Sequence, residues 1–136
     1  ELAVMIILDT HIWIWWLNDA TSQLDEAWAE AIRTSSGIAV SAISCFEVAW
    51  LERHRRIELP VELTEWFEKA TVGSGIEIIP ITPAIAMTAV ALPEHHSDPQ
   101  DRLIMATAIA SQANLISADS KFRMYKELEG RLLPTA

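Results

Sequence analysis

The sequence predicts an α/β fold built on a mostly parallel sheet, and three observations point to it. Short apolar runs at residues 4–8 and 115–118 have the length and composition of buried strands. Segments with helical periodicity separate such runs, as in chains that cross over between parallel strands. With 136 residues, of which 51% are hydrophobic and 21% charged, the chain fits one globular domain over residues 1–136.

Five segments are expected to be strands, because each is short, apolar and bounded by turn or helix-start residues. They are residues 4–8, 38–40, 76–81, 115–118 and 132–133, the last as an edge strand. In an open parallel sheet, ligands bind at the carboxyl ends of the strands. Polar residues that directly follow a predicted strand are therefore candidates for a site.

Helices are expected between the strands, because apolar residues recur there every three or four positions. One clear stripe joins Leu24, Ala27, Trp28, Ala31 and Ile32. Prolines at positions 60 and 83 suit the first turn of a helix. The predicted helices cover residues 10–18, 25–34, 44–53, 60–70, 84–91, 101–113 and 121–127.

Composition excludes several classes of protein. The single cysteine, Cys45, rules out an internal disulfide and a thiolate zinc cluster, and it fits a reducing compartment such as the cytoplasm. We expect neither a membrane span nor a signal peptide, and residues 1–4 would precede a natural start at Met5. The net charge of -9 argues against broad DNA binding but suits a basic partner protein.

Acidic residues stand at unusual places in this pattern. Asp9 and Asp119 end apolar runs, Glu47 lies inside an apolar helical stretch, and Asp98 and Asp101 open the long helix. Buried acids are costly unless a positive group meets them, and a divalent cation is the simplest such group. Carboxylate oxygens suit Mg²⁺ or Mn²⁺.

Each acid also has an ordinary structural explanation when it is taken alone. Asp9 and Asp98 could cap the helices that follow them, and Asp119 could form a turn. Glu47 could pair with an arginine from another element. The joint pattern is more specific than any of its members.

The sequence resembles the PIN-domain family, and within it the VapC-type toxins of bacterial type II toxin–antitoxin systems. The resemblance spans Met5 to about Pro134 and rests on four ordered motifs. These are Ile7-Leu8-Asp9-Thr10-His11, Ser41-Ala42-Ile43-Ser44-Cys45-Phe46-Glu47, His96-Ser97-Asp98-Pro99-Gln100-Asp101-Arg102-Leu103-Ile104 and Ile116-Ser117-Ala118-Asp119-Ser120-Lys121-Phe122.

The resemblance implies a three-layer α/β/α sandwich with about five strands and an Mg²⁺- or Mn²⁺-dependent endoribonuclease. That enzyme would hydrolyse RNA phosphodiester bonds with metal-activated water. The implied catalytic and metal-binding acids are Asp9, Glu47, Asp101 and Asp119, and Asp98 is a further metal ligand or a helix cap. Residues implied to support the acids or contact substrate are Thr10, Ser44 and Arg102.

Two alternatives stay open at this point: an RNA-processing nuclease of the same fold that is not a toxin, and a non-catalytic domain that binds metal or a partner. Among other polar residues, His11, His95 and His96 are expected to be structural more often than functional. The basic run at positions 53–56 would either complement the end of a helix or contact an RNA backbone.

Tryptophan is abundant, with six in the chain, and three of them crowd into Trp13-Ile14-Trp15-Trp16. A short helix cannot bury so many apolar side chains in its own core, so some are expected to face outward or to be covered by a neighbouring element. The resemblance supplies two candidate partners for such a surface, a small antitoxin and a second copy in a homodimer.

Overall fold

Four parallel strands form the sheet at the centre of the computed structural model, which describes residues 5–19 and 22–135. The strands are β1 (Ile6–Leu8), β2 (Ile38–Ser41), β3 (Glu77–Ile79) and β4 (Asn114–Ile116), in the order β3-β2-β1-β4. All three pairings are parallel, and Ile6 stands opposite both Ile38 and Asn114. The first and last strands of the chain are therefore neighbours in the sheet.

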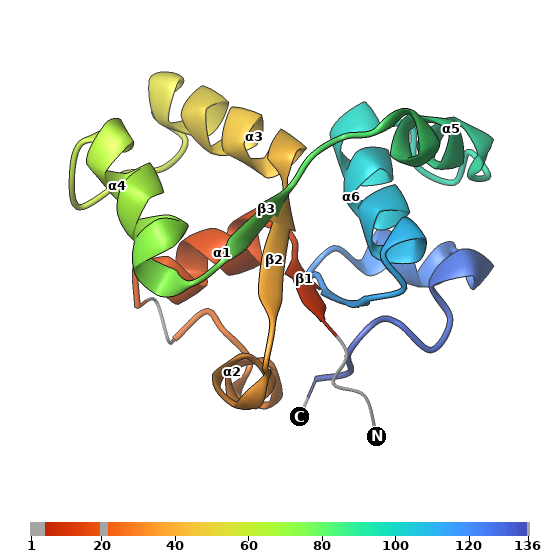
Figure 1. Ribbon diagram of the computed structural model, residues 1–136, viewed down its shortest axis with the longest axis horizontal. Coiled ribbons are helices and arrows are strands. Elements are labelled where there is room, and N and C mark those ends of the chain that lie inside the picture. The colour runs from red at the N-terminus through yellow and green to blue at the C-terminus, as the bar shows by residue number, and fades with distance from the viewer. Residues whose placement is uncertain (1–4, 20–21, 136) are drawn as a thin grey trace.

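Helices cover both faces of this sheet (Figure 1). The described residues form six α-helices: α1 (Thr10–Leu17), α2 (Glu26–Thr34), α3 (Ala42–Arg53), α4 (Leu63–Ala70), α5 (Pro83–Ala91) and α6 (Pro99–Ala110). Helices α1, α2 and α4 lie on one side, and α5 and α6 lie on the other (Figure 1). The predicted three-layer α/β/α arrangement is thus confirmed.

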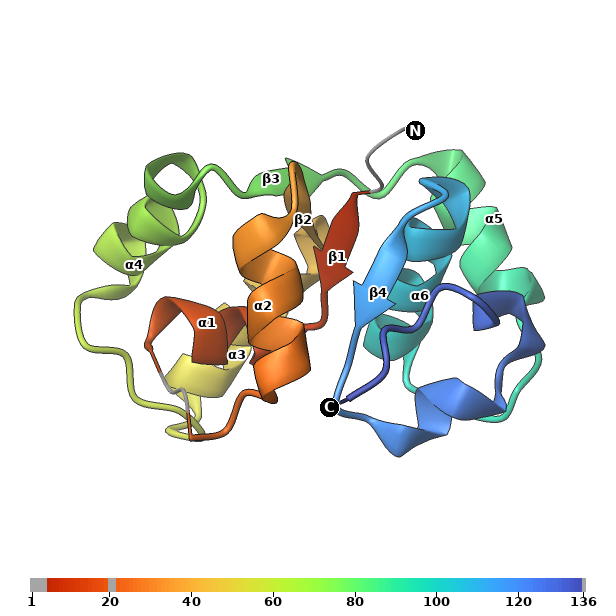
Figure 2. The same ribbon diagram turned by 90° about the horizontal axis from the view of Figure 1, so that it is seen from below.

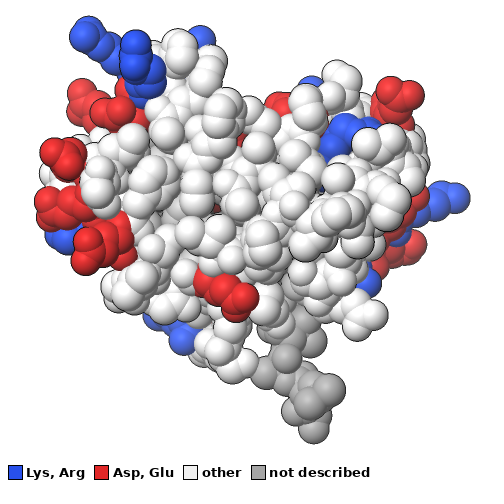
Figure 3. Space-filling model, turned by 45° about the horizontal axis from the view of Figure 1, so that its top comes forward, with Lys and Arg blue, Asp and Glu red and all other residues white. Residues whose placement is uncertain are grey.

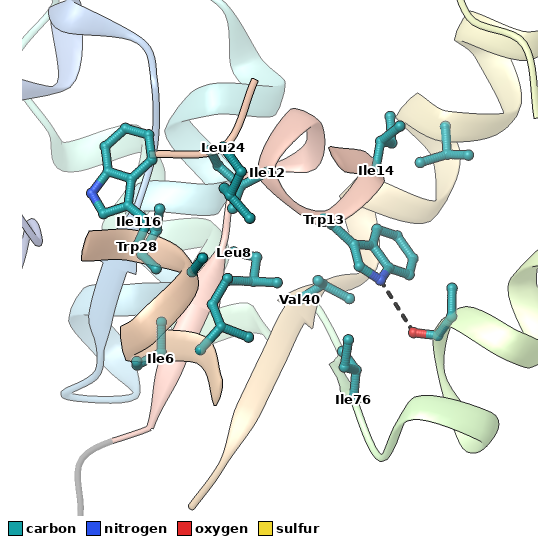
Figure 4. Close-up of a cluster of buried hydrophobic side chains, with 14 of the residues drawn as sticks. Ile6, Leu8, Ile12, Trp13, Ile14, Leu24, Trp28, Val40, Ile76 and Ile116 are labelled. Atoms are coloured by element: carbon teal, nitrogen blue, oxygen red, sulfur yellow. Dashed lines mark hydrogen bonds between the residues drawn. The ribbon is translucent and has the colours of Figure 1, made fainter. Parts of the chain in front are cut away.

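The side chains of β1 point alternately to the two faces of the sheet, so each face has its own hydrophobic core. Ile6 and Leu8 pack toward α1 and α2 in a cluster that also holds Val40 (Figure 4). Ile7 belongs to the cluster around Ile104 instead. Successive side chains of a strand point to opposite faces, so three consecutive apolar residues are what a strand buried on both faces requires.

Tryptophan side chains connect helix α1 to helix α4. The indole N–H of Trp13, which is fully buried, donates to the carbonyl of Ala70 at 3.1 Å (Figure 4). The ring of Trp13 meets the edge of Trp66 at 5.1 Å between centroids. The indole N–H of Trp66 in turn donates to Asn18. Each buried indole keeps a hydrogen-bond acceptor while its ring fills the core.

The rest of the Trp-rich helix is only partly covered. Trp15 and Trp16 are half-buried, and with Leu17, Leu24 and Ala29 they line a groove of about 430 Å³ between α1 and α2. Within the part of the chain that the structure describes, no helix has both the length and the apolar character needed to cross a membrane.

Two predicted elements near the C-terminal end of the fold differ from the structure. The predicted fifth strand is reduced to a single bridge between Leu132 and Leu115, so the sheet has four strands rather than about five. The predicted helix at 121–127 consists of two 3₁₀ turns, η2 (Ser120–Met124) and η3 (Lys126–Leu128). The predicted start of the first strand at Val4, and the question of residues 1–4, lie outside the described residues.

Pro60 does not open α4. That helix begins at Leu63, after Glu62, whose side chain makes no capping hydrogen bond. The proline is predicted in the first turn of the helix, but it lies three residues ahead of Leu63, in the preceding bend. The prediction fails because a proline shortly before a helix is compatible with both positions.

Candidate metal-binding active site

Asp9 and Asp119 lie close together because their strands are neighbours. β1 and β4 run parallel and end at the same edge of the sheet (Figure 2). The Ser117 hydroxyl ties the two acids together, since it donates to Asp9 Oδ2 at 2.6 Å and accepts the backbone N–H of Asp119 at 3.1 Å. Two acids from opposite ends of the chain thus share one serine.

Glu47 reaches this edge from α3, which follows β2 directly. The hydroxyl of Thr10, the first residue of α1, donates to Glu47 Oε1 at 2.6 Å and lies 2.9 Å from the hydroxyl of Ser44. The backbone N–H of Thr10 donates to Asp9 Oδ1 at 2.8 Å. Thr10 and Ser44 are fully buried, so they hold Asp9 and Glu47 in fixed orientations.

The loop between α5 and α6 adds a histidine. His96 Nε2 lies 2.5 Å from Asp101 Oδ2 and 3.7 Å from Asp119 Oδ2. Asp98 caps α6 by accepting the backbone N–H of Gln100 at 2.8 Å. One ligand atom from each of His96, Asp98 and Asp101 falls within 4.8 Å of the others.

Burial of these acids raises the pKa of three carboxyl groups. Desolvation, together with the negative charges of Asp9 and Asp98, raises the pKa of Asp101 to about 7. Desolvation also raises the pKa of Asp9, against the lowering effect of its hydrogen bond from Ser117. The pKa of Glu47 is raised for the same reason, with Asp9 and Asp98 adding to the effect. These mutual effects place the acids in one electrostatic cluster.

The donors of the cluster fit a hard divalent cation. They are mostly carboxylate oxygens, and His96 adds one imidazole nitrogen. Within residues 5–19 and 22–135, the ion pairs made by these acids come from His96, and no lysine or arginine lies within 4.0 Å of them. A divalent cation would supply the missing positive charge.

The structure brings the predicted site residues to one place, with one exception. The five acids gather at the carboxyl edge of the sheet, and Thr10 and Ser44 hold two of them. Their chemical roles stay predictions, because geometry alone does not test them. Asp98 is a helix cap and also a member of the ligand cluster.

Arg102 is the exception, because its side chain binds main-chain carbonyls rather than an acid of the site. Its guanidinium is buried and donates to five main-chain carbonyls, those of Ala89, Val90, Leu92, Pro93 and His96. Among the described residues, Arg102 forms no ion pair with an acid. Arg102 instead satisfies the carbonyls at the end of α5 and organises the loop that carries His96.

His96 is the residue that sequence reasoning misses. The sequence favours a structural role for it, yet it contacts two of the acids. The available signal is its position two residues before the cap of α6, where the chain turns back toward the helix N-terminus. His95 agrees with the structural expectation, since its ring packs edge-on against Tyr125 at 5.0 Å between centroids. His11 is exposed, with its ring tilted against that of Trp15.

Comparison with known proteins identifies the family. A family model described as PIN domain matches residues 6–128. The chain belongs to the PIN-domain family. It is 38% identical over 122 residues to the protein named Ribonuclease VapC22 from Mycobacterium tuberculosis, covering 89% of this chain and 92% of that protein.

Solved structures agree at the level of the fold. One is VapBC2 from Rickettsia felis bound to a promoter DNA fragment, with a TM-score of 0.68 and 19% identity over 97% of this chain and 99% of that chain. Another is a toxin–antitoxin complex from Klebsiella pneumoniae, with a TM-score of 0.64 and 23% identity over 95% of this chain and 96% of that chain. The predicted resemblance to VapC-type proteins is thus confirmed.

Proposed function

We propose that this chain is the endoribonuclease toxin of a toxin–antitoxin pair, and that it hydrolyses RNA in the cytoplasm with the help of Mg²⁺ or Mn²⁺. The observation that carries the proposal is the gathering of acids from four separate segments at one sheet edge, with no lysine or arginine near them in the described part of the chain. The 38% identity to a protein named as a ribonuclease supports RNA as the substrate.

Each acid has a proposed role at this edge. Asp9, Glu47, Asp101 and Asp119 would hold the cation through carboxylate oxygens, and Asp98 would support them with the oxygen that does not cap α6. When bound, a divalent cation supplies the positive charge and Lewis acidity that phosphodiester hydrolysis by water needs.

The surrounding hydroxyls orient the carboxylates. Ser117 and the backbone of Thr10 occupy one lone pair on each oxygen of Asp9, and the Thr10 hydroxyl occupies one on Oε1 of Glu47. Glu47 therefore keeps Oε2 available. His96 Nε2 lies 2.5 Å from Asp101 Oδ2. Because the pKa of Asp101 is raised to about 7, a proton on this carboxyl group must leave before Asp101 can bind a cation as a carboxylate.

The test is cleavage of RNA by purified protein in Mg²⁺ or Mn²⁺. We expect EDTA to abolish cleavage, and Asp9→Asn to reduce it by roughly a hundredfold or more while the circular dichroism spectrum stays unchanged. Glu68→Gln on α4 removes an exposed carboxylate elsewhere and should leave cleavage intact. Undiminished cleavage by Asp9→Asn would refute the proposed site.

Two partner proteins belong to this proposal. The half-buried groove of Trp15, Trp16 and Leu17 would receive an apolar segment of an antitoxin, and the solved structures with this fold include a toxin–antitoxin complex. A second copy would cover exposed apolar residues of α5, namely Met87 and Val90. The face of the molecule seen in Figure 3 has a broad central area with few charges.

A further inference from the structure

Helix α3 carries a second group of polar and aromatic side chains beyond Glu47. Glu47, Trp50 and His54 are spaced by three and then four residues, so they follow one another along a single stripe of the helix. At 1.5 Å of rise per residue, His54 lies about 10 Å along the axis from Glu47. A nucleic-acid strand lying across the acidic site along α3 would reach this group next.

The group is a stacked aromatic pair flanked by arginine. The rings of Trp50 and His54 stack at 4.0 Å between centroids with an interplanar angle of 21°. The His54 ring nitrogen Nδ1 lies 2.8 Å from the carbonyl of Trp50, which fixes the ring in place. The guanidinium of Arg56 lies over the indole, with Cζ 5.8 Å from the ring centroid. Trp50 nevertheless remains 41% exposed.

Positive charge concentrates here on an otherwise acidic protein. Arg53, Arg55 and Arg56 are three of the ten lysines and arginines in the chain, and all three are exposed. Basic side chains gather at the C-terminal end of α3, at the upper left of Figure 3. Within residues 5–19 and 22–135, none of the three lies within 4.0 Å of a carboxylate, so their charge is available to a ligand.

The backbone at Arg55 adds an independent observation. Arg55 has φ = 57°, in the left-handed region that favours glycine. Its N–H donates to the carbonyl of Glu52, and the N–H of Arg56 donates to that of Leu51, which is the Schellman pattern of a helix C-terminus. The left-handed residue of that motif is usually glycine. An arginine at this position introduces conformational strain, and it also places an exposed positive charge at the end of α3.

We propose that the end of α3 is a docking site for single-stranded RNA, with Trp50 and His54 offering a stacking surface for a base and Arg53, Arg55 and Arg56 contacting phosphates. This inference rests on the proposed ribonuclease function and assigns the surface that receives the RNA beside the cleavage site. Exposed aromatic rings interleaved with basic side chains are the combination that binds single strands. Because the protein as a whole is acidic, this site determines where RNA is held.

The test uses Arg55→Gly in the full-length chain. Glycine suits the left-handed backbone, so the melting temperature should be unchanged or higher. We expect KM for a single-stranded RNA to rise about three- to tenfold with kcat unchanged, because the arginine binds the ground state and the transition state equally. The slope of log affinity against log salt should fall by about 0.7 for each phosphate that the variant no longer neutralises. Trp50→Ala should weaken binding to a similar extent.

Two control variants separate charge from backbone effects. Gln112→Gly makes the same change at the end of α6, where Gln112 has φ = 53° and the same pair of hydrogen bonds closes the helix. Lys126→Gln removes one exposed positive charge from η3. Both should leave KM for RNA unchanged.

A second measurement keeps this inference distinct from the proposed function. Fluorescence anisotropy of a labelled single-stranded RNA, with every variant carrying Asp101→Asn in Mn²⁺, reports binding even if the protein cleaves no RNA. A rise of about three- to tenfold in Kd for the Arg55→Gly protein supports the docking site whatever the outcome for cleavage. The docking site is refuted if the Arg55→Gly protein has the same Kd and the same KM as the parent. It is also refuted if light scattering shows a change in oligomeric state while RNA affinity stays the same.

Discussion

At the scale of single residues, the acids of the site are held in a state that costs stability. Asp9 and Asp101 are both largely shielded from water, and the negative charge of Asp9 acts on Asp101. Their raised pKa values record that cost. Residues kept in an unfavourable environment in this way are typical of sites that bind a positive ligand.

The pH dependence of stability follows from Asp101. Its pKa rises from 3.8 to about 7 on folding, so the folded chain binds more protons than the unfolded chain between those values. The free energy of unfolding of the metal-free protein should therefore fall as pH rises from about 4 to about 7, and Asp9 and Glu47 act in the same direction. Urea unfolding in EDTA at several pH values would measure this, and Asp101→Asn should flatten the profile.

Asp101→Asn should also separate stability from activity. The amide removes a buried negative charge, so we expect the metal-free protein to gain about 1–2 kcal/mol in unfolding free energy at about pH 8. The same variant loses a cation ligand and should cleave RNA at least about a hundredfold more slowly. A variant that lost stability at that pH would contradict the view that charge repulsion and desolvation dominate at this residue.

Cation binding should release a proton near neutral pH. The pKa of Asp101 is raised to about 7, so near neutral pH much of the metal-free protein carries a proton on this carboxyl group, whereas a bound cation needs Asp101 ionised. Titration of Mn²⁺ slightly below neutral pH in two buffers of different ionisation enthalpy should show this release by calorimetry. Equal heats of Mn²⁺ binding in the two buffers would contradict the role of Asp101 as a cation ligand.

At the scale of elements, Arg102 joins α5 to α6 and shapes the loop that presents His96. Five carbonyls converge on one planar guanidinium, which spans them as an ammonium group cannot. The arrangement explains how the short loop between two helices holds a histidine against an acid.

Arg102→Lys tests this structural role. A lysine keeps the charge but loses most of the hydrogen bonds to buried carbonyls, so the protein should lose about 2–3 kcal/mol in unfolding free energy. If Arg102 contacted substrate instead, the variant would keep its stability and lose RNA affinity. Chemical denaturation and RNA binding measured on the same preparation distinguish the two.

At the scale of the whole molecule, sequence reasoning succeeds where local pattern and tertiary packing agree. The apolar runs predict the strands β1, β2 and β4, and acids at strand ends predict the site, because parallel strands bring their carboxyl ends to one edge. The last edge strand is mispredicted because two apolar residues cannot reveal whether a neighbour extends the sheet. The contacts of His96 with two acids and of Arg102 with five carbonyls could not be predicted, because the path of a loop decides what each side chain contacts and no local pattern encodes that path.

The antitoxin groove and the acidic site should be separable by mutation. Trp15→Ala and Trp16→Ala alter half-buried side chains between α1 and α2, away from the carboxylates. We expect antitoxin affinity to fall at least about tenfold with RNA cleavage by the isolated protein unchanged. Co-purification with the antitoxin and a cleavage assay would measure both, and Thr64→Ala at an exposed position of α4 is a suitable control.

The pairing of the first strand with the last carries a consequence for synthesis. Asp9 leaves the ribosome early, but the serine that orients it and the acid beside it arrive with residues 117 and 119, near the end of the chain. A nascent or truncated chain that lacks β4 has no complete set of acids and, on the proposed mechanism, cannot cut the RNA around it. On this mechanism, the toxin becomes active only after β4 has been synthesised and has paired with β1.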